Sequence, residues 1–197
     1  SPVKTRLRVT LLGTGNPRPV PDRYGPSILI EAATSPPTRI LIDAGRGSAE
    51  RLFTLGGREL LSGIDLLLIT HLHSDHVVGL PDLWLTGWIF GRRSPLEVRG
   101  PEGVEQLTSG LKTAYAFDVH MRGDIDEKLP VEGVEMVTET IRSYSPIEFH
   151  GVKITPITVD HGPVKPALGY RIDFGGKSVV LSGDTRYSEN LLHAATG

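Results

Sequence analysis

An unbroken apolar segment in the first half of the chain sets the strongest limit on the fold. The four residues from Leu66 to Ile69 are all aliphatic and lie within the segment 65–70. A short aliphatic run without polar alternation is typical of a β-strand that is buried on both faces of its sheet. The sequence therefore predicts an α/β protein, because other layers must cover such a strand on both sides.

Short segments punctuated by glycine and proline lie on both sides of this strand. The chain contains 23 glycines and 15 prolines, and its apolar spacing predicts strands mixed with helices. The other predicted strands are 7–12, 27–32, 39–43, 96–99, 134–141, 152–159, 168–174 and 177–182. The predicted helices are 48–55, 77–90 (with Pro81 near its start), 103–116 and 187–194. We expect the second half to be largely antiparallel, with a hairpin at Gly175-Gly176.

The composition is that of a globular protein. The 197 residues are 39% hydrophobic and 22% charged, with a net charge of −2. No apolar run approaches the roughly 18 residues of a membrane span, so we expect one domain over 1–197 and no membrane partner. The near-neutral charge also argues against nucleic acid as a partner. Because cysteine is absent, any metal ion must be held by histidines and carboxylates.

A dense group of metal-ligand residues follows the apolar strand at 71–76 (HLHSDH). In an extended segment His71 and His73 point the same way and can share one cation, because side chains repeat every two residues. Asp75 and His76 follow as the chain turns into the next helix, so they reach a neighbouring position. These donors predict two divalent metal ions, zinc first, with manganese or iron as alternatives. The competing interpretation is a loop of unrelated histidines, with Asp75 capping the helix.

Two later residues are placed to join the same site. His161 and Asp184 each follow a predicted strand at a glycine-containing break. Ligands offered from the ends of several strands suit a site at the edge of a sheet. Taken alone, however, His161 is compatible with a surface histidine and Asp184 with an ordinary loop residue.

Six short motifs are spread in order over nearly the whole chain. They are 12–15 (LGTG), 41–45 (LIDAG), 70–76 (THLHSDH) followed by 79–81 (GLP), 160–162 (DHG), 169–172 (GYRI) and 182–185 (SGDT). With these motifs the chain resembles the metallo-β-lactamase superfamily, and within it the tRNase Z-like branch that also holds arylsulfatases and phosphodiesterases. The resemblance implies an αββα sandwich of two mixed sheets flanked by helices.

The resemblance also implies a role for each site residue. One ion would be held by His71, His73 and His161, the other by Asp75 and His76, with Asp184 bridging both. Asp43 would orient a ligand histidine, although a strand-end carboxylate that satisfies loop amides is equally compatible with the sequence. The implied chemistry is attack by hydroxide, generated between the two metal ions and oriented by Asp75.

Two departures from the family's pattern concern completeness and substrate. Only 13 residues follow Asp184, so the family's late histidine ligand and its leaving-group acid are missing, and the one later histidine, His193, lies in a predicted helix. We therefore expect that the C-terminal portion is absent, and that a homo-oligomer or a complementing chain could complete the second metal site. Only 22 residues separate His161 from Asp184, which leaves no room for the tRNA-binding arm of bacterial tRNase Z.

The predicted function is metal-dependent hydrolysis of an ester-like bond in a small molecule, a phosphodiester before any other. Arylsulfatase, lactonase or β-lactamase-type activity and tRNA 3′-end processing are the alternatives among enzymes. The alternative outside enzymes is a catalytically incomplete metal-binding fragment. The compartment is left open: cytoplasmic, or periplasmic or secreted if a signal peptide has been removed.

Two further features have a structural and a functional interpretation. Trp84 and Trp88 lie four residues apart on the helix after the histidines and could form a leaving-group pocket. Packing of that helix onto the sheet is the interpretation we favour. Residues 13–15 lack the spacing of a phosphate-binding loop and instead predict a tight turn beside the site.

Overall fold

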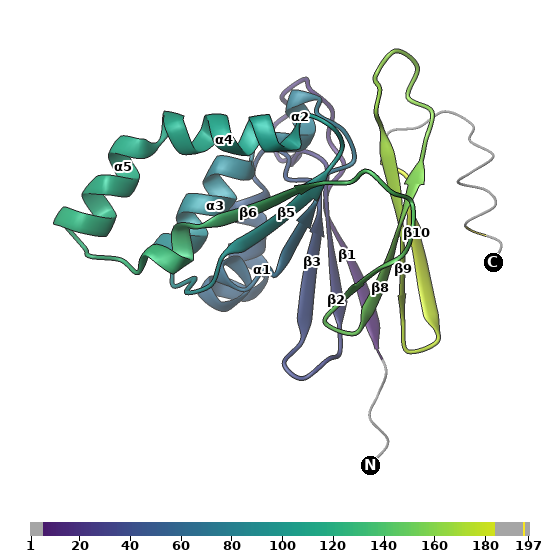
Figure 1. Cartoon of the computed structure of the whole chain (residues 1–197), viewed down its shortest axis with the longest axis horizontal. Coiled ribbons are helices and arrows are strands. Elements are labelled where there is room, and N and C mark those ends of the chain that lie inside the picture. Colours follow the sequence, from purple (N-terminus) through teal and green to yellow (C-terminus); the bar gives the residue numbers. More distant parts are fainter. Residues whose placement is uncertain (1–5, 184–194, 196–197) are drawn as a thin grey trace.

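The protein is built from two β-sheets that lie face to face, with helices on the outer side of the first sheet (Figure 1). The computed structural model describes residues 6–183 and residue 195. The first sheet has the order β1 (Leu7–Gly13), β2 (Ser27–Ala32), β3 (Thr38–Ile42), β4 (Leu66–Leu68), β5 (Leu96–Gly100), β6 (Met136–Thr140). The second has the order β10 (Lys177–Leu181), β9 (Leu168–Phe174), β8 (Val152–Thr158), β7 (Ile147–Phe149).

The helices lie mostly on one side of the first sheet, which they separate from solvent (Figure 1). They are α1 (Ser48–Ser62), α2 (Ser74–Val77), α3 (Leu80–Ile89), α4 (Val104–Ala114) and α5 (Ala116–His120), with the π-helix η1 (Met121–Ile125) and the 3₁₀-helix η2 (Val131–Val134). None of the described helices combines the length and the hydropathy needed to cross a bilayer.

The central strand β4 confirms the main prediction from the sequence. It pairs in parallel with β3 on one side and with β5 on the other. Leu67 packs in the core beneath the helices, whereas Leu66 and Leu68 pack in the core between the two sheets. All three side chains are 0% exposed, which explains why the segment contains no polar residue.

The second sheet corrects the expectation of two mixed sheets. The first sheet is mixed, but every described pairing within the second sheet is antiparallel. Two of its connections, from β7 to β8 and from β9 to β10, are two residues long, and a two-residue turn cannot carry the chain back for a parallel pairing. Gly175 and Gly176 form such a turn, both with positive φ, as predicted. Within residues 6–183 no helix covers the outer face of this sheet, so the described layers are α, β and β (Figure 1).

The predicted helix over 77–90 is observed as α3, which begins only at Leu80, because the chain breaks at Gly79 between the short α2 and α3. The backbone N–H of Gly79 donates to the carbonyl of Ala44 at 2.9 Å, and a Cβ at Gly79 would lie 2.1 Å from the carbonyl oxygen of Gly45. This close approach of the turn after β3 breaks the helix, and Pro81 lies in the first turn of α3 as expected.

Other boundaries differ from the prediction because local sequence signals are weak there. Helix α1 continues to Ser62 across a non-helical Gly57, well beyond the predicted end at residue 55. The elements α5, η1, η2 and β7 were not predicted. The predicted helix over 187–194 lies outside the described residues.

Candidate metal centre

The site lies where strands of both sheets end at the same edge of the sandwich. Because β3 and β4 are parallel neighbours, their C-terminal ends lie at the same edge of the sheet. The residues that follow these strands, Asp43 and Thr70, therefore lie side by side at that edge. Strand β8 of the second sheet leads to His161. The backbone N–H of Leu168 donates to the carbonyl of Thr70 at 2.8 Å, and this hydrogen bond joins the two sheets beside the site.

Three of the predicted metal ligands converge here. One ring nitrogen from each of His71, His73 and His161 lies within 4.8 Å of the others. Nε2 of His71 is 3.2 Å from Nδ1 of His73, and the ring centroids of His71 and His161 are 4.7 Å apart. His71 is buried, His161 is half-buried and His73 is exposed, so the cluster reaches from the interior to the surface.

This cluster fits a divalent metal ion. Nε2 of His161 is buried and has no hydrogen-bond partner within the described part of the chain. A buried imidazole nitrogen without such a partner is unusual, and a metal ion would satisfy it. Three neutral imidazoles suit zinc and other borderline transition metals.

Helix α2 places two more predicted ligands beside the cluster. Nε2 of His76 lies 3.7 Å from Oδ2 of Asp75, and the ring centroid of His76 is 4.1 Å from that of His71. Asp75 does not cap α2, whose N-cap residue is His73. Five of the six predicted ligands therefore lie in one contiguous group, and the sixth, Asp184, lies outside the described residues.

Asp43 lies behind His76 and is itself buried. Its Oδ2 atom is 2.7 Å from Nδ1 of His76, and its Oδ1 atom accepts the backbone N–H of Thr70 at 2.8 Å. Burial raises the pKa of Asp43, and the hydrogen bond and charge of His76 partly lower it. The carboxylate thus supports an imidazole and also satisfies a loop amide, so both interpretations from the sequence describe it.

Thr70 belongs to the site as well, although no role was predicted for it from the sequence. Its hydroxyl donates to Oδ2 of Asp43 at 2.7 Å and lies 3.0 Å from Nδ1 of His71. Since the hydroxyl hydrogen is used by Asp43, the same oxygen can accept Nδ1–H of His71, which leaves Nε2 of His71 for a metal ion. The only sequence signal is its position, directly between the buried strand and the first histidine.

Tyr170 is a second residue that the sequence analysis did not assign to the site. Its hydroxyl donates to the carbonyl of Ile69 at 2.5 Å, from a position 101 residues further along the chain. Burial raises the pKa of Tyr170 well above 10, and the charge of Asp43 adds to this effect. The hydrogen bond fixes the end of β4, from which the histidines begin.

A cavity of about 320 Å³ adjoins Asp43 and His76. Residues 13–15 line it, beside the site as predicted, but Gly13 ends β1 and no turn is formed there; residues 180–183 at the end of β10 also line the cavity. This segment packs closely against the residues before β2, since a Cβ at Gly13 would lie 2.2 Å from the carbonyl oxygen of Gly25.

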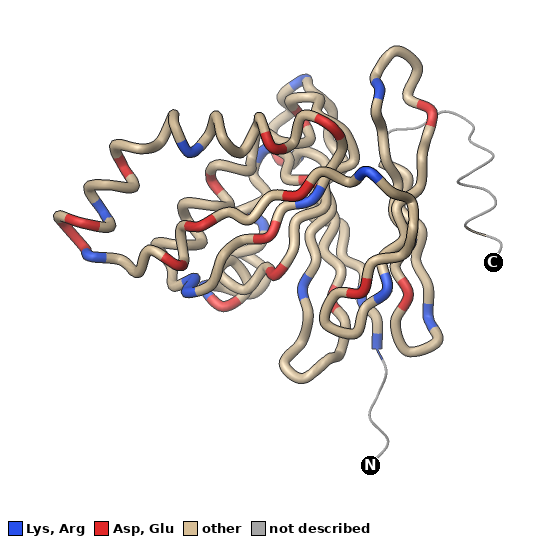
Figure 2. The backbone as a smooth tube through the Cα atoms, viewed as in Figure 1, with Lys and Arg blue, Asp and Glu red and all other residues tan. Residues whose placement is uncertain are grey.

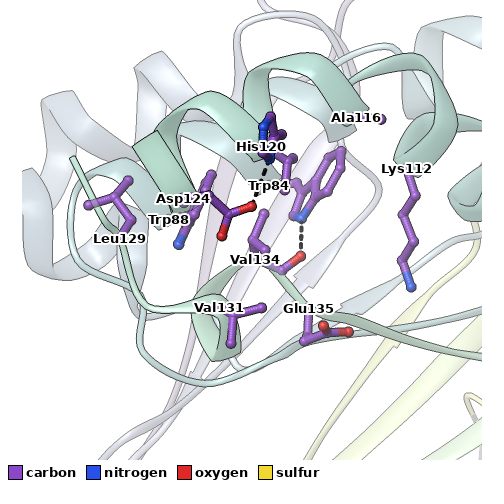
Figure 3. Close-up of a pocket in the computed structure, with 12 residues that line it drawn as sticks. Trp84, Trp88, Lys112, Ala116, His120, Asp124, Leu129, Val131, Val134 and Glu135 are labelled. Atoms are coloured by element: carbon purple, nitrogen blue, oxygen red, sulfur yellow. Dashed lines mark hydrogen bonds and ion pairs between the residues drawn. The ribbon is translucent and has the colours of Figure 1, made fainter. Parts of the chain in front are cut away.

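The two tryptophans pack the helix layer, which is the interpretation favoured from the sequence. Both are buried, and their indole N–H groups donate to the carbonyls of Val134 (from Trp84) and Pro130 (from Trp88), each at 2.8 Å. They also line a cavity of about 360 Å³ beneath α5 and η1 (Figure 3). This cavity includes none of the predicted metal ligands, so it is not the leaving-group pocket considered above.

Comparison with known proteins identifies the class to which this fold and site belong. The family described as "Beta-lactamase superfamily domain" matches residues 38–196. The metallo-beta-lactamase fold protein YhfI of Bacillus subtilis superposes with a TM-score of 0.69 at 20% identity, over 93% of this chain and 65% of that one. The short form of human tRNase Z gives a TM-score of 0.67 at 20% identity, over 89% and 68%. The class is that of the metal-dependent hydrolases with this fold.

Among curated proteins, the chain is similar to ribonuclease Z of Mycobacterium marinum, with 36% identity over 198 residues. The match covers 97% of this chain, which spans about two thirds (67%) of the length of that relative. The chain therefore belongs to the metallo-β-lactamase superfamily, in the tRNase Z-like branch that its motifs predicted. It is accordingly assigned to the metal-dependent hydrolases.

These relatives conflict with the expectation that nucleic acid is not a partner. The alignment with the M. marinum protein is 198 residues long and covers 97% of this chain, so it has almost the same length as the segment of this chain that it covers. The M. marinum protein therefore also has no long insertion between the counterparts of His161 and Asp184. Net charge is a sum over the whole chain, along whose backbone acidic and basic residues are interspersed (Figure 2). The missing arm and the charge of −2 were therefore wrong as grounds to exclude RNA.

Proposed function

We propose that this chain binds divalent metal ions, zinc first, at the histidine cluster and hydrolyses phosphodiester bonds in RNA. The observation that carries the proposal is the convergence of His71, His73 and His161 within 4.8 Å, with a buried Nε2 on His161 that has no hydrogen-bond partner among the described residues. RNA is the proposed substrate class because the curated relatives are named Ribonuclease Z.

The side chains around the cluster have separate tasks in this proposal. Asp75, His76 and Asp184 are the proposed ligands of a second ion. Bound divalent ions in such a site supply ionisation of water near neutral pH and neutralisation of charge on phosphoryl oxygens. Asp75 accepts a hydrogen bond from the attacking water and orients it. Asp43 holds Nδ1 of His76, which keeps Nε2 toward Asp75.

The proposed reaction adds one water across a phosphorus–oxygen bond. The water oxygen forms a bond to phosphorus, the bond to the leaving ribose oxygen breaks, and the leaving oxygen takes up a proton. A tRNA precursor with a 3′ extension is the first RNA to test, because 3′-end processing is the activity that the family resemblance implies. Small phosphodiesters, sulfate esters and lactones are the competing substrates.

The test combines metal content with turnover. Elemental analysis of the purified chain, beside its intact mass, should give two ions per chain, and end-labelled precursor RNA should be cleaved. His161→Asn should lose at least one ion per chain and lower turnover by about 100-fold or more, since it removes a direct ligand.

The matched control is His150→Asn. His150 stacks on Phe149, away from the cluster, and should be replaceable without loss of metal or turnover. A chain that contains no metal, or a His161→Asn variant that retains all of it, would overturn the metal site. Hydrolysis of lactones or sulfate esters without hydrolysis of any phosphodiester would overturn the substrate class.

A further inference from the structure

An exposed arginine lies beside the proposed catalytic aspartate. Arg46 follows Gly45 in the turn between β3 and α1. It borders a cavity of about 220 Å³ that is also lined by Asn16, Ser74 and Asp75. The residues that line this cavity thus include an arginine, an asparagine, a serine and a predicted metal ligand.

The backbone of Arg46 is held rigidly in this position. Its carbonyl accepts the backbone N–H of Gly25 at 2.8 Å, and the N–H of Gly45 donates to the carbonyl of Pro26 at 3.0 Å. A Cβ at Gly25 would lie 2.5 Å from the backbone nitrogen of Arg46, so the two loops are in direct contact. The close packing fixes where the side chain starts, relative to the site.

The guanidinium of Arg46 retains most of its hydrogen-bonding capacity. Within residues 6–183 it donates one hydrogen bond, to the carbonyl of Arg23 at 3.0 Å, and forms no ion pair. An arginine has five N–H donors in a planar fork that matches two oxygens of a phosphate. By contrast, six other arginines form ion pairs with carboxylates: Arg8, Arg39, Arg99, Arg122, Arg142 and Arg171.

The charges around Arg46 favour an anion on the side of the metal centre. Arg46 also lines a larger hollow together with Asp22, Glu50 and Arg23, whose carbonyl accepts the hydrogen bond of the Arg46 guanidinium. Among the described residues that line the smaller cavity, Asp75 is the only one with a carboxylate. Its charge is the one that a bound metal ion would neutralise, so the remaining charge in that cavity is the positive charge of Arg46.

We propose that Arg46 binds a non-bridging phosphate oxygen of the substrate beside Asp75, and so selects anionic phosphodiesters over neutral esters. This inference rests on the proposed phosphodiester hydrolysis. It adds a substrate-binding residue that is neither a predicted metal ligand nor one of the side chains that support a ligand.

The first test compares two substrates with the same leaving group. Bis(p-nitrophenyl) phosphate carries one negative charge, whereas p-nitrophenyl acetate is neutral. Arg46→Gln should raise KM for the phosphodiester about 10- to 100-fold, the range of one charge-assisted hydrogen bond, and leave KM for the acetate within about twofold. Arg46→Lys should restore part of the loss, because it keeps the charge without the planar fork.

The matched control is Arg58→Gln. Arg58 is an exposed arginine on α1 whose guanidinium lies over the ring of Phe90, and it lines neither hollow beside Arg46. It should change neither KM value, and metal content should be the same in all variants. An equal rise of KM for both substrates in Arg46→Gln would indicate a general distortion of the site and overturn the inference.

A binding measurement separates this inference from the proposed activity. Fluorescence anisotropy of a labelled single-stranded RNA analogue that resists hydrolysis, measured with the metal-loaded chain, requires no turnover. Arg46→Gln should weaken binding and reduce the slope of log K against log salt by about 0.7, the value for one phosphate contact on a single strand. Equal affinity and equal slope would overturn the inference whether or not the chain hydrolyses RNA. Absence of hydrolysis by the wild type, with the expected binding difference, would overturn only the proposed activity.

Discussion

Nδ1 of His76 lies 2.7 Å from Oδ2 of Asp43, and both side chains are buried. The two residues come from different elements, since Asp43 follows β3 whereas His76 belongs to α2. The contact fixes the imidazole so that Nε2 faces Asp75, 3.7 Å from its carboxylate oxygen. Asp43 therefore determines which nitrogen of His76 is presented to a metal ion.

Replacing Asp43 with asparagine should weaken metal binding without removing a ligand. We expect Asp43→Asn to lower zinc affinity about 10- to 100-fold, because partners of a ligand histidine fix its tautomer and orientation. Competition with a chromophoric chelator measures this affinity. Asp65→Asn is the control, because Asp65 accepts the backbone N–H of Arg39 at the opposite ends of β3 and β4. Equal zinc affinity for wild type and Asp43→Asn would contradict the prediction.

A methyl group at Gly183 should disturb the site through Thr70. Gly183 has φ of +59°, and a Cβ there would lie 2.9 Å from Cβ of Thr70. Gly176 also has positive φ, but a Cβ there meets open space. Each alanine variant should lose about 1–2 kcal/mol of unfolding free energy from the left-handed backbone. Only Gly183→Ala should also lower zinc affinity. Urea unfolding and zinc titration measure the two effects, and unchanged zinc binding in both variants would show that Thr70 is not coupled to the metal site.

Tyr170 should make stability fall at high pH. Burial raises its pKa in the folded state well above 10, so the unfolded chain releases the phenolic proton first as the pH rises. The contribution of Tyr170 is therefore complete below about pH 10 and is lost above it. Tyr170→Phe should cost about 1 kcal/mol near pH 8, through the lost hydrogen bond to Ile69. The free energy of unfolding of Tyr170→Phe should also decline less steeply than that of wild type as the pH rises toward about 11. The free energy of unfolding is measured by urea unfolding at each pH. An equal decline with pH in wild type and Tyr170→Phe would count against this explanation.

Trp84 should matter for stability and not for the substrate. Trp84→Phe removes the hydrogen bond to the carbonyl of Val134 and part of a buried ring. We expect a loss of about 1–3 kcal/mol in the free energy of unfolding, since a buried carbonyl is left unpaired. The KM values for aryl phosphodiesters should be unchanged. A rise of KM confined to aryl substrates would instead support a leaving-group pocket at this tryptophan.

Local patterns explain the parts of the fold that were predicted correctly. The aliphatic run at 66–69 predicted a strand buried on both faces, because a strand with no polar face must be covered on both sides. The pair Gly175-Gly176 predicted a hairpin, because its positive φ values suit a two-residue turn. The break at Gly79 was missed because it depends on the backbone of Gly45, which is distant in the sequence.

The same division holds for the metal centre. The sequence by itself determined which metal-ligand side chains are available, since ligand chemistry is a property of each residue. It also determined that the side chains of His71 and His73 point the same way, since the two-residue repeat of an extended segment is local. Only the tertiary structure brought His161 to within reach of His71 and placed Asp43 behind His76. These contacts depend on how two sheets and a helix pack against one another. Such packing arises from many weak apolar contacts between residues that are distant in the sequence, and a short motif does not predict these contacts.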